Sequence, residues 1–414
     1  MHSATNIQKA RHFRFLRSVF WLGFTAFGGP QMHLPYFKKR FVDKFKFITQ
    51  DELVEINAFC SILPGPSTTQ TITSIGYKVG GTKIAILTIL LWSIPGAIIM
   101  TLLGLSPKFL NAQELSFLPA MVIGFMAFGT WKMFQWIDQK PLNIVLFILA
   151  GILGFVFRNP WFFPIGVLLG GFISSRFNNT VRIKKKWKPR EFKWVNLTIF
   201  ASIFFIVGIS GILITKYKTE SKWKQPVVLF ENTYRLGALS FGGGNVFAAM
   251  TMEQYVHHTK RMDIQDLNIG IAASQAVPGP NFNLAAYSNT VALRNQNSPK
   301  SMQILGGIIG LIGVFLPGTL LVLFAFPIWD RLQTFSAINR AVPGIFAVSV
   351  GFILTACLLL GNELWHTLKN TQFENIWIHL GLIIATFFML ISEKIPTPFI
   401  VLFAVAIGWF VSLN

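Results

Sequence analysis

Long apolar runs separated by short polar connectors dominate the chain. Uninterrupted runs about as long as the roughly 17–25 helical residues that cross a bilayer occur near 84–104, 115–137, 141–157, 160–175, 195–215, 302–326, 341–361, 375–392 and 397–413. Each run continues for longer than a typical strand of 5–6 residues. The pattern therefore predicts an all-α polytopic membrane protein.

Four other apolar segments are interrupted by glycine and proline. The interruptions are Gly28-Gly29-Pro30, Pro64-Gly65-Pro66, Gly242-Gly243-Gly244 and Pro278-Gly279-Pro280. Proline removes a backbone donor and clashes with the preceding helical turn, and it also favours extended geometry in the residue before it. Non-helical backbone at membrane depth is tolerated only where it is buried in protein or lines a wet cavity. These segments are therefore predicted to be helices that are broken in the membrane or turn back as hairpins.

The interruptions also reveal a duplication. Phe27-Gly28-Gly29-Pro30 returns as Phe241-Gly242-Gly243-Gly244, and Pro64-Gly65-Pro66 returns as Pro278-Gly279-Pro280, both after 214 positions. Two chain-breaking motifs repeated in register indicate a repeated unit. The predicted organisation is a first repeat over 1–176, a basic loop plus one linking transmembrane helix over 177–226, and a second repeat over 227–414.

Charge predicts the orientation of the two repeats. The chain carries a net charge of +20, and basic residues are concentrated in 1–17 and 176–193. Lys and Arg stay on the cytoplasmic side, so both ends of the first repeat, including the N-terminus, are expected in the cytoplasm. The single span 195–215 then starts the second repeat on the opposite side, which predicts inverted copies. The connector 38–50 has five basic residues and one acidic residue, whereas the equivalent 252–264 has two of each.

The basic residues in the connectors bear on the predicted orientation and on the molecules that the protein contacts. Lys216, Lys218, Lys222 and Lys224 would lie outside the cell, which weakly opposes the orientation. Because the basic residues lie in connectors between apolar runs, their expected partner is anionic membrane lipid, and no nucleic-acid partner is expected.

Helix ends at the four interruptions are candidate binding sites for an oxyanion. A helix that starts within the membrane has unpaired N–H groups and a partial positive charge of about half a unit at its N-terminus. The predicted binding set comprises the glycines and prolines of the four interruptions and the polar residues that follow them: Gln31, Ser67, Thr68, Thr69, Asn245, Asn281 and Asn283. Helix capping and interhelical hydrogen bonding would use the same residue types, so this alternative stays open.

Ionisable residues add further candidates. Lys78 and Arg294 end the helices after the two Pro-Gly-Pro motifs, where they either bind the anion or extend to the membrane interface. Glu55 and His33 are the candidates for proton coupling, against a solvated connector face and a structural histidine. Two cysteines and the adjacent His257-His258 form no recognisable metal or cofactor motif, and no clustered acid and base suggests an enzyme.

The duplicated motifs resemble those of the chromate ion transporter family in its long, two-domain form. The similar text is FTAFGGPQMHLPYF and ILPGPSTTQ in the first half, with LGALSFGGGNVF and ASQAVPGPNFNLAAY in the second. The resemblance implies export of chromate across the inner membrane, chromate resistance, coupling to the proton gradient, and sulfate as a substrate analogue. Gly244 replaces Pro30 in the second half, so the halves are expected to bind unequally.

Several alternatives remain. An uncoupled oxyanion channel and a transporter of another divalent oxyanion such as sulfate are both compatible with these residues. A homodimer also stays open, because no residue identifies an interface.

Overall fold

The structure, a computed structural model, is built of helices throughout the residues it describes. These residues are 2–27, 30–106, 116–135, 137–157, 162–177, 195, 198–199, 201–203, 205–207, 209–210, 224–240, 244–329, 336–370, 375–392 and 394–412. Residues 178–194 of the predicted basic loop and residues 196, 197, 200, 204, 208 and 211–215 of the predicted linking span at 195–215 lie outside this part of the chain.

The first half contributes eight elements. They are α1 (His2–Thr25), α2 (Pro30–Phe37), the π-helix η1 (Lys38–Lys44), α3 (Gln50–Ile62), α4 (Ser67–Leu105), α5 (Leu118–Phe134), α6 (Pro141–Phe157) and α7 (Phe162–Phe177). The helix α4 contains the predicted run 84–104 and begins already at Ser67, directly after the first Pro-Gly-Pro motif, and its backbone is non-helical at Gly80 and Gly81. Glycine permits this kink because it adopts positive φ, here +73° at Gly81.

The second half contains a matching series. It comprises α9 (Lys224–Leu239), α10 (Gly244–Thr251), the π-helix η2 (Met252–His258), α11 (Ile264–Ala276), the short 3₁₀ turn η3 (Asn281–Asn283), α12 (Leu284–Asn295), α13 (Lys300–Ala325), the 3₁₀ turn η4 (Phe326–Ile328), α15 (Ser336–Asn370), α16 (Ile376–Ser392) and α17 (Thr397–Ser412). The bounds of α2, η1 and α3 recur in α10, η2 and α11 after 214 positions.

The backbone between these elements recurs as well. After each π-helix the chain passes through a left-handed residue, Lys46 with φ 51° and Lys260 with φ 49°. The next helix then begins at a side-chain cap: Thr49 accepts from the Glu52 amide, and Asp263 accepts from the Asp266 amide. Oxygen-bearing side chains stabilise helix starts in this way by satisfying an otherwise unpaired N–H.

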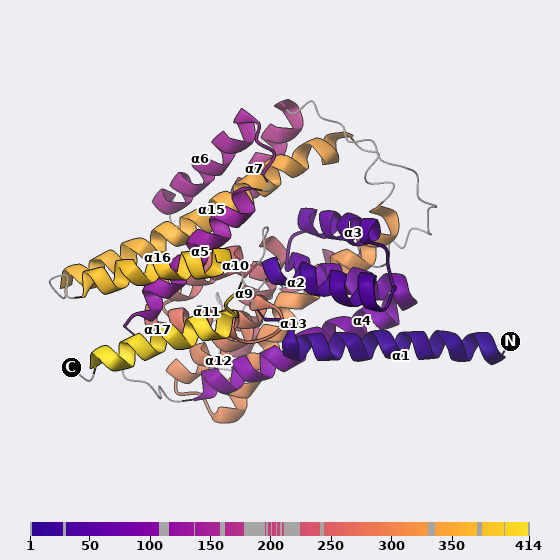
Figure 1. Cartoon of the computed structure of the whole chain (residues 1–414), viewed down its shortest axis with the longest axis horizontal. Helices are drawn as coiled ribbons and strands as arrows, with labels where there is room; N and C mark the ends of the chain where they lie inside the picture. The colour runs from indigo at the N-terminus through magenta and orange to yellow at the C-terminus, as the bar shows by residue number, and fades with distance from the viewer. Residues whose placement is uncertain are drawn as a thin grey trace.

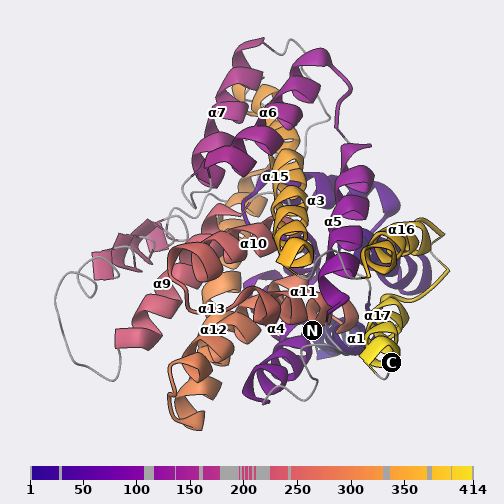
Figure 2. The ribbon, with the colours of Figure 1, turned by 90° about the vertical axis from the view of Figure 1, so that its left-hand side faces the viewer.

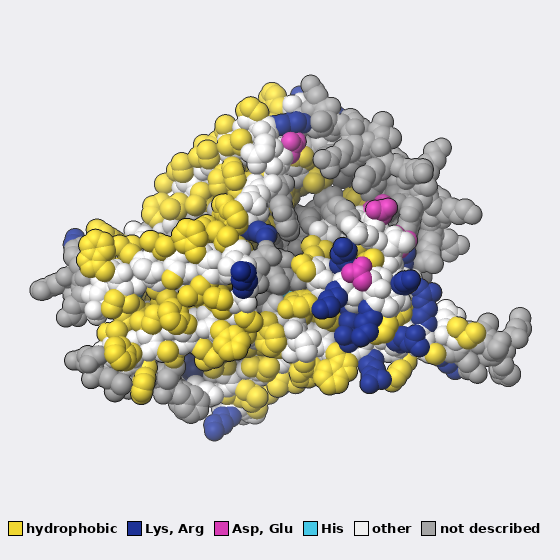
Figure 3. Space-filling view, in the orientation of Figure 1, with side chains coloured by type: hydrophobic (Ala, Val, Ile, Leu, Met, Phe, Trp, Pro, Cys, Tyr) yellow, Lys and Arg dark blue, Asp and Glu magenta, His cyan; other side chains and the backbone are white. Residues whose placement is uncertain are grey.

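Length and composition place this chain in a membrane. In the described part of the chain, three helices are long and apolar enough to cross one, over Ser67–Leu105, Lys300–Ala325 and Arg340–Asn370. Shorter apolar helices lie at Leu118–Phe134, Pro141–Phe157, Ile165–Phe177, Ile376–Ser392 and Thr397–Val411. Apolar side chains cover the surface over α16 and α17 (Figure 3). The prediction of an all-α polytopic membrane protein is confirmed.

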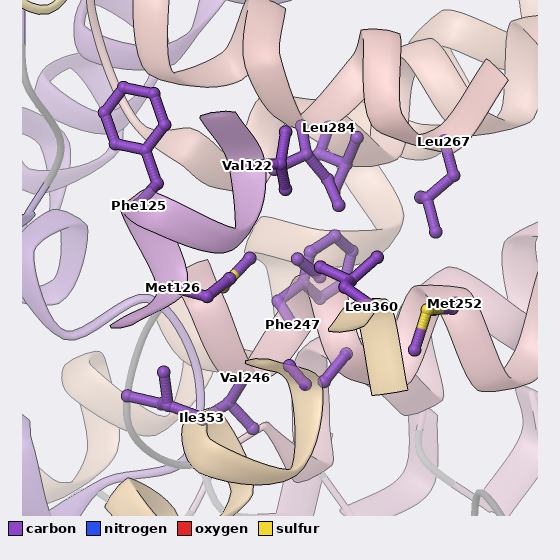
Figure 4. Close-up of a cluster of buried hydrophobic side chains, with 14 of the residues drawn as sticks. Val122, Phe125, Met126, Val246, Phe247, Met252, Leu267, Leu284, Ile353 and Leu360 are labelled. Carbon is purple, nitrogen blue, oxygen red and sulfur yellow. The ribbon is translucent and has the colours of Figure 1, made fainter. Parts of the chain in front are cut away.

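The helices pack in two groups. In one, α15 lies against α5, α6 and α7, and α16 lies against α5 (Figures 1 and 2). In the other, α13 lies against α4, α9 and α12, and α4 also packs on α1. An apolar cluster joins the groups, with Val122 from α5, Phe247 from α10, Leu284 from α12 and Leu360 from α15 (Figure 4). Each group therefore contains helices from both halves of the sequence.

Glycine allows two helix pairs to approach closely at equivalent places. A Cβ on Gly237 of α9 would lie 2.5 Å from the Val314 carbonyl oxygen of α13. A Cβ on Gly23 of α1 would lie 2.7 Å from the Leu91 carbonyl oxygen of α4. Small residues at membrane helix contacts permit this backbone approach.

We expect Gly237→Ala to destabilise the protein, because the new methyl group meets backbone that cannot rotate away. Overpacking of this kind typically costs about 1–3 kcal/mol. The matched control is Gly361→Ala on α15, where no atom lies within 4 Å of the new Cβ. Thermal unfolding in detergent should show a lowered midpoint for Gly237→Ala and no loss for Gly361→Ala; equal midpoints would contradict the packing described.

Candidate functional site

Each Pro-Gly-Pro motif is held by the opposite half of the chain. The Gly65 amide donates to the Ser240 carbonyl oxygen at 2.5 Å, and the Gly279 amide donates to the Ala26 carbonyl oxygen at 3.0 Å. The donors are 214 positions apart, and so are the acceptors. Ala26 and Ser240 lie two residues before the two glycine-rich interruptions. Each Pro-Gly-Pro tip is therefore hydrogen-bonded to the end of the helix that precedes the other half's glycine-rich interruption.

The central glycines are required at both tips. Gly65 has φ +112° and Gly279 has φ +96°, a region that side-chain-bearing residues rarely adopt. A Cβ on Gly65 would also lie 2.9 Å from Gln70 Nε2, and one on Gly279 would lie 3.3 Å from the Trp92 carbonyl oxygen. Backbone conformation and close contact thus both favour glycine here.

The segments around these tips are helical hairpins. In the first, Thr71 Oγ1 donates to Asn57 Oδ1 at 3.4 Å, so α3 lies beside the first part of α4. In the second, the Tyr287 hydroxyl donates to the Asp266 carbonyl oxygen at 2.9 Å. Helices α3 and α11 each have 13 residues, or about 20 Å at 1.5 Å per residue. This is shorter than a hydrocarbon core of about 30 Å.

Neither helix start at a Pro-Gly-Pro motif has a side-chain cap. Pro66 precedes α4 and Pro280 precedes η3, and neither supplies a capping hydrogen bond. The first intrahelical bond of α4 runs from the Gln70 amide to the Pro66 carbonyl oxygen at 2.8 Å. The amides of Ser67, Thr68 and Thr69 precede that bond and remain available, which is the property that makes a helix start bind anions.

Two aromatic side chains contact the first turn of α4. His33 Nδ1 lies 3.4 Å from Thr68 Oγ1, and Trp92 Nε1 donates to Thr69 Oγ1 at 3.2 Å. The imidazole and indole rings meet edge to face with centroids 5.0 Å apart. All four side chains are buried, while Ser67 is partly buried. Trp92 was missed in the sequence analysis, since a tryptophan in an apolar run indicates only lipid contact or packing.

The second half places amides at the equivalent start. Asn281 Nδ2 donates to Gln275 Oε1 at 3.0 Å, and Asn283 Nδ2 donates to the Ser93 carbonyl oxygen at 3.2 Å. The Oδ1 atoms of Asn281 and Asn283 are buried and have no hydrogen-bond partner among the described residues. The amide nitrogens are thus engaged and the oxygens are left as acceptors.

Lys78 and Arg294 lie at the far ends of the hairpins. Lys78 comes 11 residues after the start of α4 at Ser67, and Arg294 comes 10 residues after the start of α12 at Leu284, or about 16 Å along each axis. Lys78 Nζ pairs with Glu52 Oε1 at 2.6 Å, and Arg294 pairs with Asp266 Oδ1 at 3.0 Å. The structure therefore does not bring these two candidates to the interruptions.

These ion pairs stabilise the hairpin bases. Arg294 also donates to the carbonyl oxygens of Gly104 and Ser106 at 3.0 Å each, which joins the second hairpin to the end of α4. Burial raises the pKa of the Glu52 carboxyl, but hydrogen bonds from Lys78 and the Thr49 amide outweigh burial and leave that pKa below its usual value.

The remaining candidates are described only in part. Gly28, Gly29, Gly242 and Gly243 lie outside the described residues, as do the side chains of Pro30, Gln31 and Asn245. Gly244 begins α10, and its Cβ position is 2.8 Å from Asn281 Cβ, which explains glycine there. Glu55 is partly buried on α3. No group of three or more His, Cys, Asp or Glu side chains among the described residues could hold a metal ion.

A family model described as Chromate transporter matches residues 13–174 and 227–409. The chain belongs to the chromate transporter family. The two matched regions begin 214 positions apart, the interval of the duplicated motifs. No solved structure matches the chain.

Curated relatives of this family member are named as transporters. An uncharacterized transporter of Methanocaldococcus jannaschii is 24% identical over 94% of this chain and 92% of its own length. A probable chromate transport protein of Synechococcus elongatus is 21% identical over 94% of this chain and 92% of its own length. An uncharacterized transporter of Bacillus subtilis is 32% identical over 138 residues, which are 30% of this chain and 70% of that protein. These names and the family point to a transporter rather than an enzyme.

We expect Arg294→Gln to destabilise the protein more than Lys78→Gln. Asp266 is 3% exposed and Glu52 is 30% exposed, so losing Arg294 leaves a carboxylate with far less water. Breaking a buried pair costs about 3–5 kcal/mol, whereas a solvated pair is worth about 1 kcal/mol or less. Unfolding in detergent measures both, and a larger loss for Lys78→Gln would contradict the difference in burial.

Proposed function

We propose that the protein is a secondary transporter that exports chromate across the inner membrane and so confers chromate resistance. The observation that carries the proposal is the meeting of both Pro-Gly-Pro tips with the opposite half of the chain, within a member of the chromate transporter family. The name of the Synechococcus elongatus relative supports the same class of substrate.

The oxyanion binds near mid-membrane at the starts of the helices that follow the interruptions. The candidate binding groups are backbone amides and the hydroxyls of Ser67, Thr68 and Thr69. The side-chain amides of Asn281 and Asn283 and the glycine-rich motifs with Gln31 and Asn245 are further candidates. Partial charges of helix dipoles and neutral donors attract a dianion without a paired cation. A ligand held in this way can also leave, as transport requires.

The two halves are inverted copies that rock against each other to alternate access to the site. The close glycine contacts at Gly23 and Gly237 and the matching hairpins support equivalent roles for the halves. The Bacillus subtilis relative, of which 138 residues are 70%, is about half as long as this chain, which supports one half as a structural unit. A homodimer is compatible with this arrangement.

Export is coupled to the proton gradient, with His33 and Glu55 as the candidate proton carriers. His33 contacts Thr68 directly, so a proton on its imidazole would add positive charge beside the bound oxyanion. Glu55 lies on α3, the other arm of the same hairpin. An uncoupled channel and a transporter of sulfate or another divalent oxyanion are the competing functions.

Chromate uptake into inside-out membrane vesicles tests the proposal. We expect uptake that rises when a proton gradient is imposed and that sulfate inhibits as an analogue. Ser67→Ala should reduce uptake by about tenfold, the loss expected from about 1.4 kcal/mol at a charge-assisted hydrogen bond. Asn281→Ala should reduce uptake less, because it removes the hydrogen bond to Gln275 at the second helix start. Uptake that follows voltage alone would favour the channel, and uptake of sulfate but not chromate would favour the other substrate.

The inverted arrangement predicts that the two termini lie on opposite sides of the membrane. The N-terminus is cytoplasmic, consistent with exposed basic side chains on α1 and η1 and the basic region near α2 and α3 in Figure 3. A fluorescent protein fused before residue 1 should fluoresce, and alkaline phosphatase fused after residue 414 should be active. Termini on the same side would contradict inversion.

A further inference from the structure

The two halves carry different side chains at equivalent positions of their helix starts. His33 and Thr68 of the first half correspond to Phe247 and Phe282 of the second, each 214 positions later. In the first half an imidazole nitrogen lies 3.4 Å from the hydroxyl oxygen. In the second half the two phenyl rings stack with centroids 4.8 Å apart and are 1% and 2% exposed. A polar contact in one half is thus an apolar contact in the other.

The hydroxyls at the start of α4 differ from the other threonines of that helix. Thr71 and Thr73 donate to the carbonyl oxygens of Ser67 and Thr69, one turn earlier. Thr68 and Thr69 are preceded by the Pro-Gly-Pro loop instead of a helical turn. The Thr68 hydroxyl can donate to His33 Nδ1 in one tautomer of the imidazole, whereas the Thr69 hydroxyl proton has no acceptor among the described residues. Both side chains are buried, at 7% and 1% exposure. The Thr69 hydroxyl is therefore a buried donor without an acceptor beside an uncapped helix start.

Trp92 determines which part of the Thr69 hydroxyl remains available. An indole N–H can only donate, so at 3.2 Å it occupies a lone pair of Thr69 Oγ1. The hydroxyl proton is then directed away from the indole and can be donated to a third group. A buried donor without an acceptor is costly, and an oxyanion oxygen would satisfy it. His33 Nε2 nearby is also buried without a hydrogen-bond partner of ordinary geometry.

The second helix start offers the opposite chemistry. The tryptophan position corresponds to Val314, since Pro95 and Gly96 align with Pro317 and Gly318. Asn283 donates its amide nitrogen to the Ser93 carbonyl oxygen and keeps an acceptor oxygen free. Gly244 packs directly on Asn281. The first start also holds such an acceptor oxygen, Gln70 Oε1, so the difference between the two starts lies in their donors. The second start has Phe282 and Val314 where the first has the Thr68 hydroxyl and the Trp92 indole.

We propose that one chain binds one tetrahedral oxyanion, at the start of α4, and that Trp92 is a positioning residue that orients the Thr69 hydroxyl as a donor to it. This inference rests on the proposed transport of an oxyanion and assigns it to a single helix start. The second helix start has a structural role, in which Asn283 ties the second hairpin to α4.

A double-mutant cycle on the purified full chain tests this role, with chromate binding measured by isothermal titration calorimetry. Thr69→Val should weaken binding by about tenfold, the effect of losing one hydrogen bond to a charged group. Trp92→Phe should weaken binding severalfold in the wild-type background and change it by less than about twofold in Thr69→Val. An equal loss in both backgrounds would mean that Trp92 acts only through packing and would overturn the role.

Two controls keep the result interpretable if a variant is unstable. Thr69→Ser retains the hydroxyl, and its chromate affinity should lie within about twofold of wild type. If Thr69→Ser lost as much affinity as Thr69→Val, the donor role would be overturned. Phe282→Leu, at the second start, should leave affinity unchanged, and a measured stoichiometry of two anions per chain would overturn the single site. The same titrations with sulfate separate the binding site from the identity of the substrate. Coupling between Thr69→Val and Trp92→Phe that is seen with sulfate but not with chromate would support the site and contradict chromate as the substrate.

Discussion

The backbone amides at the two Pro-Gly-Pro tips need hydrogen-bond acceptors, and the rest of this structure depends on that constraint. Each tip interrupts a helix among apolar helices, where an unpaired amide costs several kcal/mol. The central amide of each tip finds its acceptor only in the other half, at Ser240 for Gly65 and at Ala26 for Gly279. The halves are therefore hydrogen-bonded to each other at their interruptions. The close contacts of Gly23 with α4 and of Gly237 with α13 bring those acceptors within reach.

The proposed binding site offers donors without a fixed positive charge. Its donors are helix-start amides and hydroxyls, while Lys78 and Arg294 are paired with carboxylates about 16 Å further along their helices. A full positive charge in a medium of low dielectric would hold a dianion tightly. Partial charges from peptide groups provide a weaker field that is already oriented, because the fold holds the amides in place before the ligand arrives. This is a reasonable design for a protein that must bind an anion on one side and lose it on the other.

Much of the fold could be predicted from the sequence, because it follows from local chemistry. The run 141–157 matches α6 at both ends, since a long apolar stretch that follows a proline has few alternatives to one helix. The interruptions were predictable because proline and glycine act on their own backbone, and the duplication follows from their spacing. The full extent of α4 was not predictable in this way, because its 39 residues from Ser67 to Leu105 include a kink at Gly80 and Gly81.

The site was less predictable because its important contacts join residues far apart in the chain. The hydroxyls after Pro66 could be identified from helix-start chemistry, but the indole that donates to Thr69 Oγ1 is 23 residues away in the sequence. The ion-pair partners of Lys78 and Arg294 lie on the opposite arm of each hairpin, 26 and 28 residues earlier. Only the three-dimensional packing shows that the Lys78 and Arg294 side chains are already paired with carboxylates. Gly244 in place of Pro30 indicated that the two halves differ, and a Cβ at Gly244 would lie 2.8 Å from Asn281 Cβ.

An experimental structure with bound chromate, located by the anomalous scattering of chromium, tests the central claim most directly. The account predicts one chromium per chain, between the two halves, with chromate oxygens within hydrogen-bonding distance of the first-turn amides of α4 and the hydroxyls of Thr68 and Thr69. Chromium at the Lys78 or Arg294 ends of the hairpins, or on the lipid-facing surface away from both Pro-Gly-Pro tips, would contradict it.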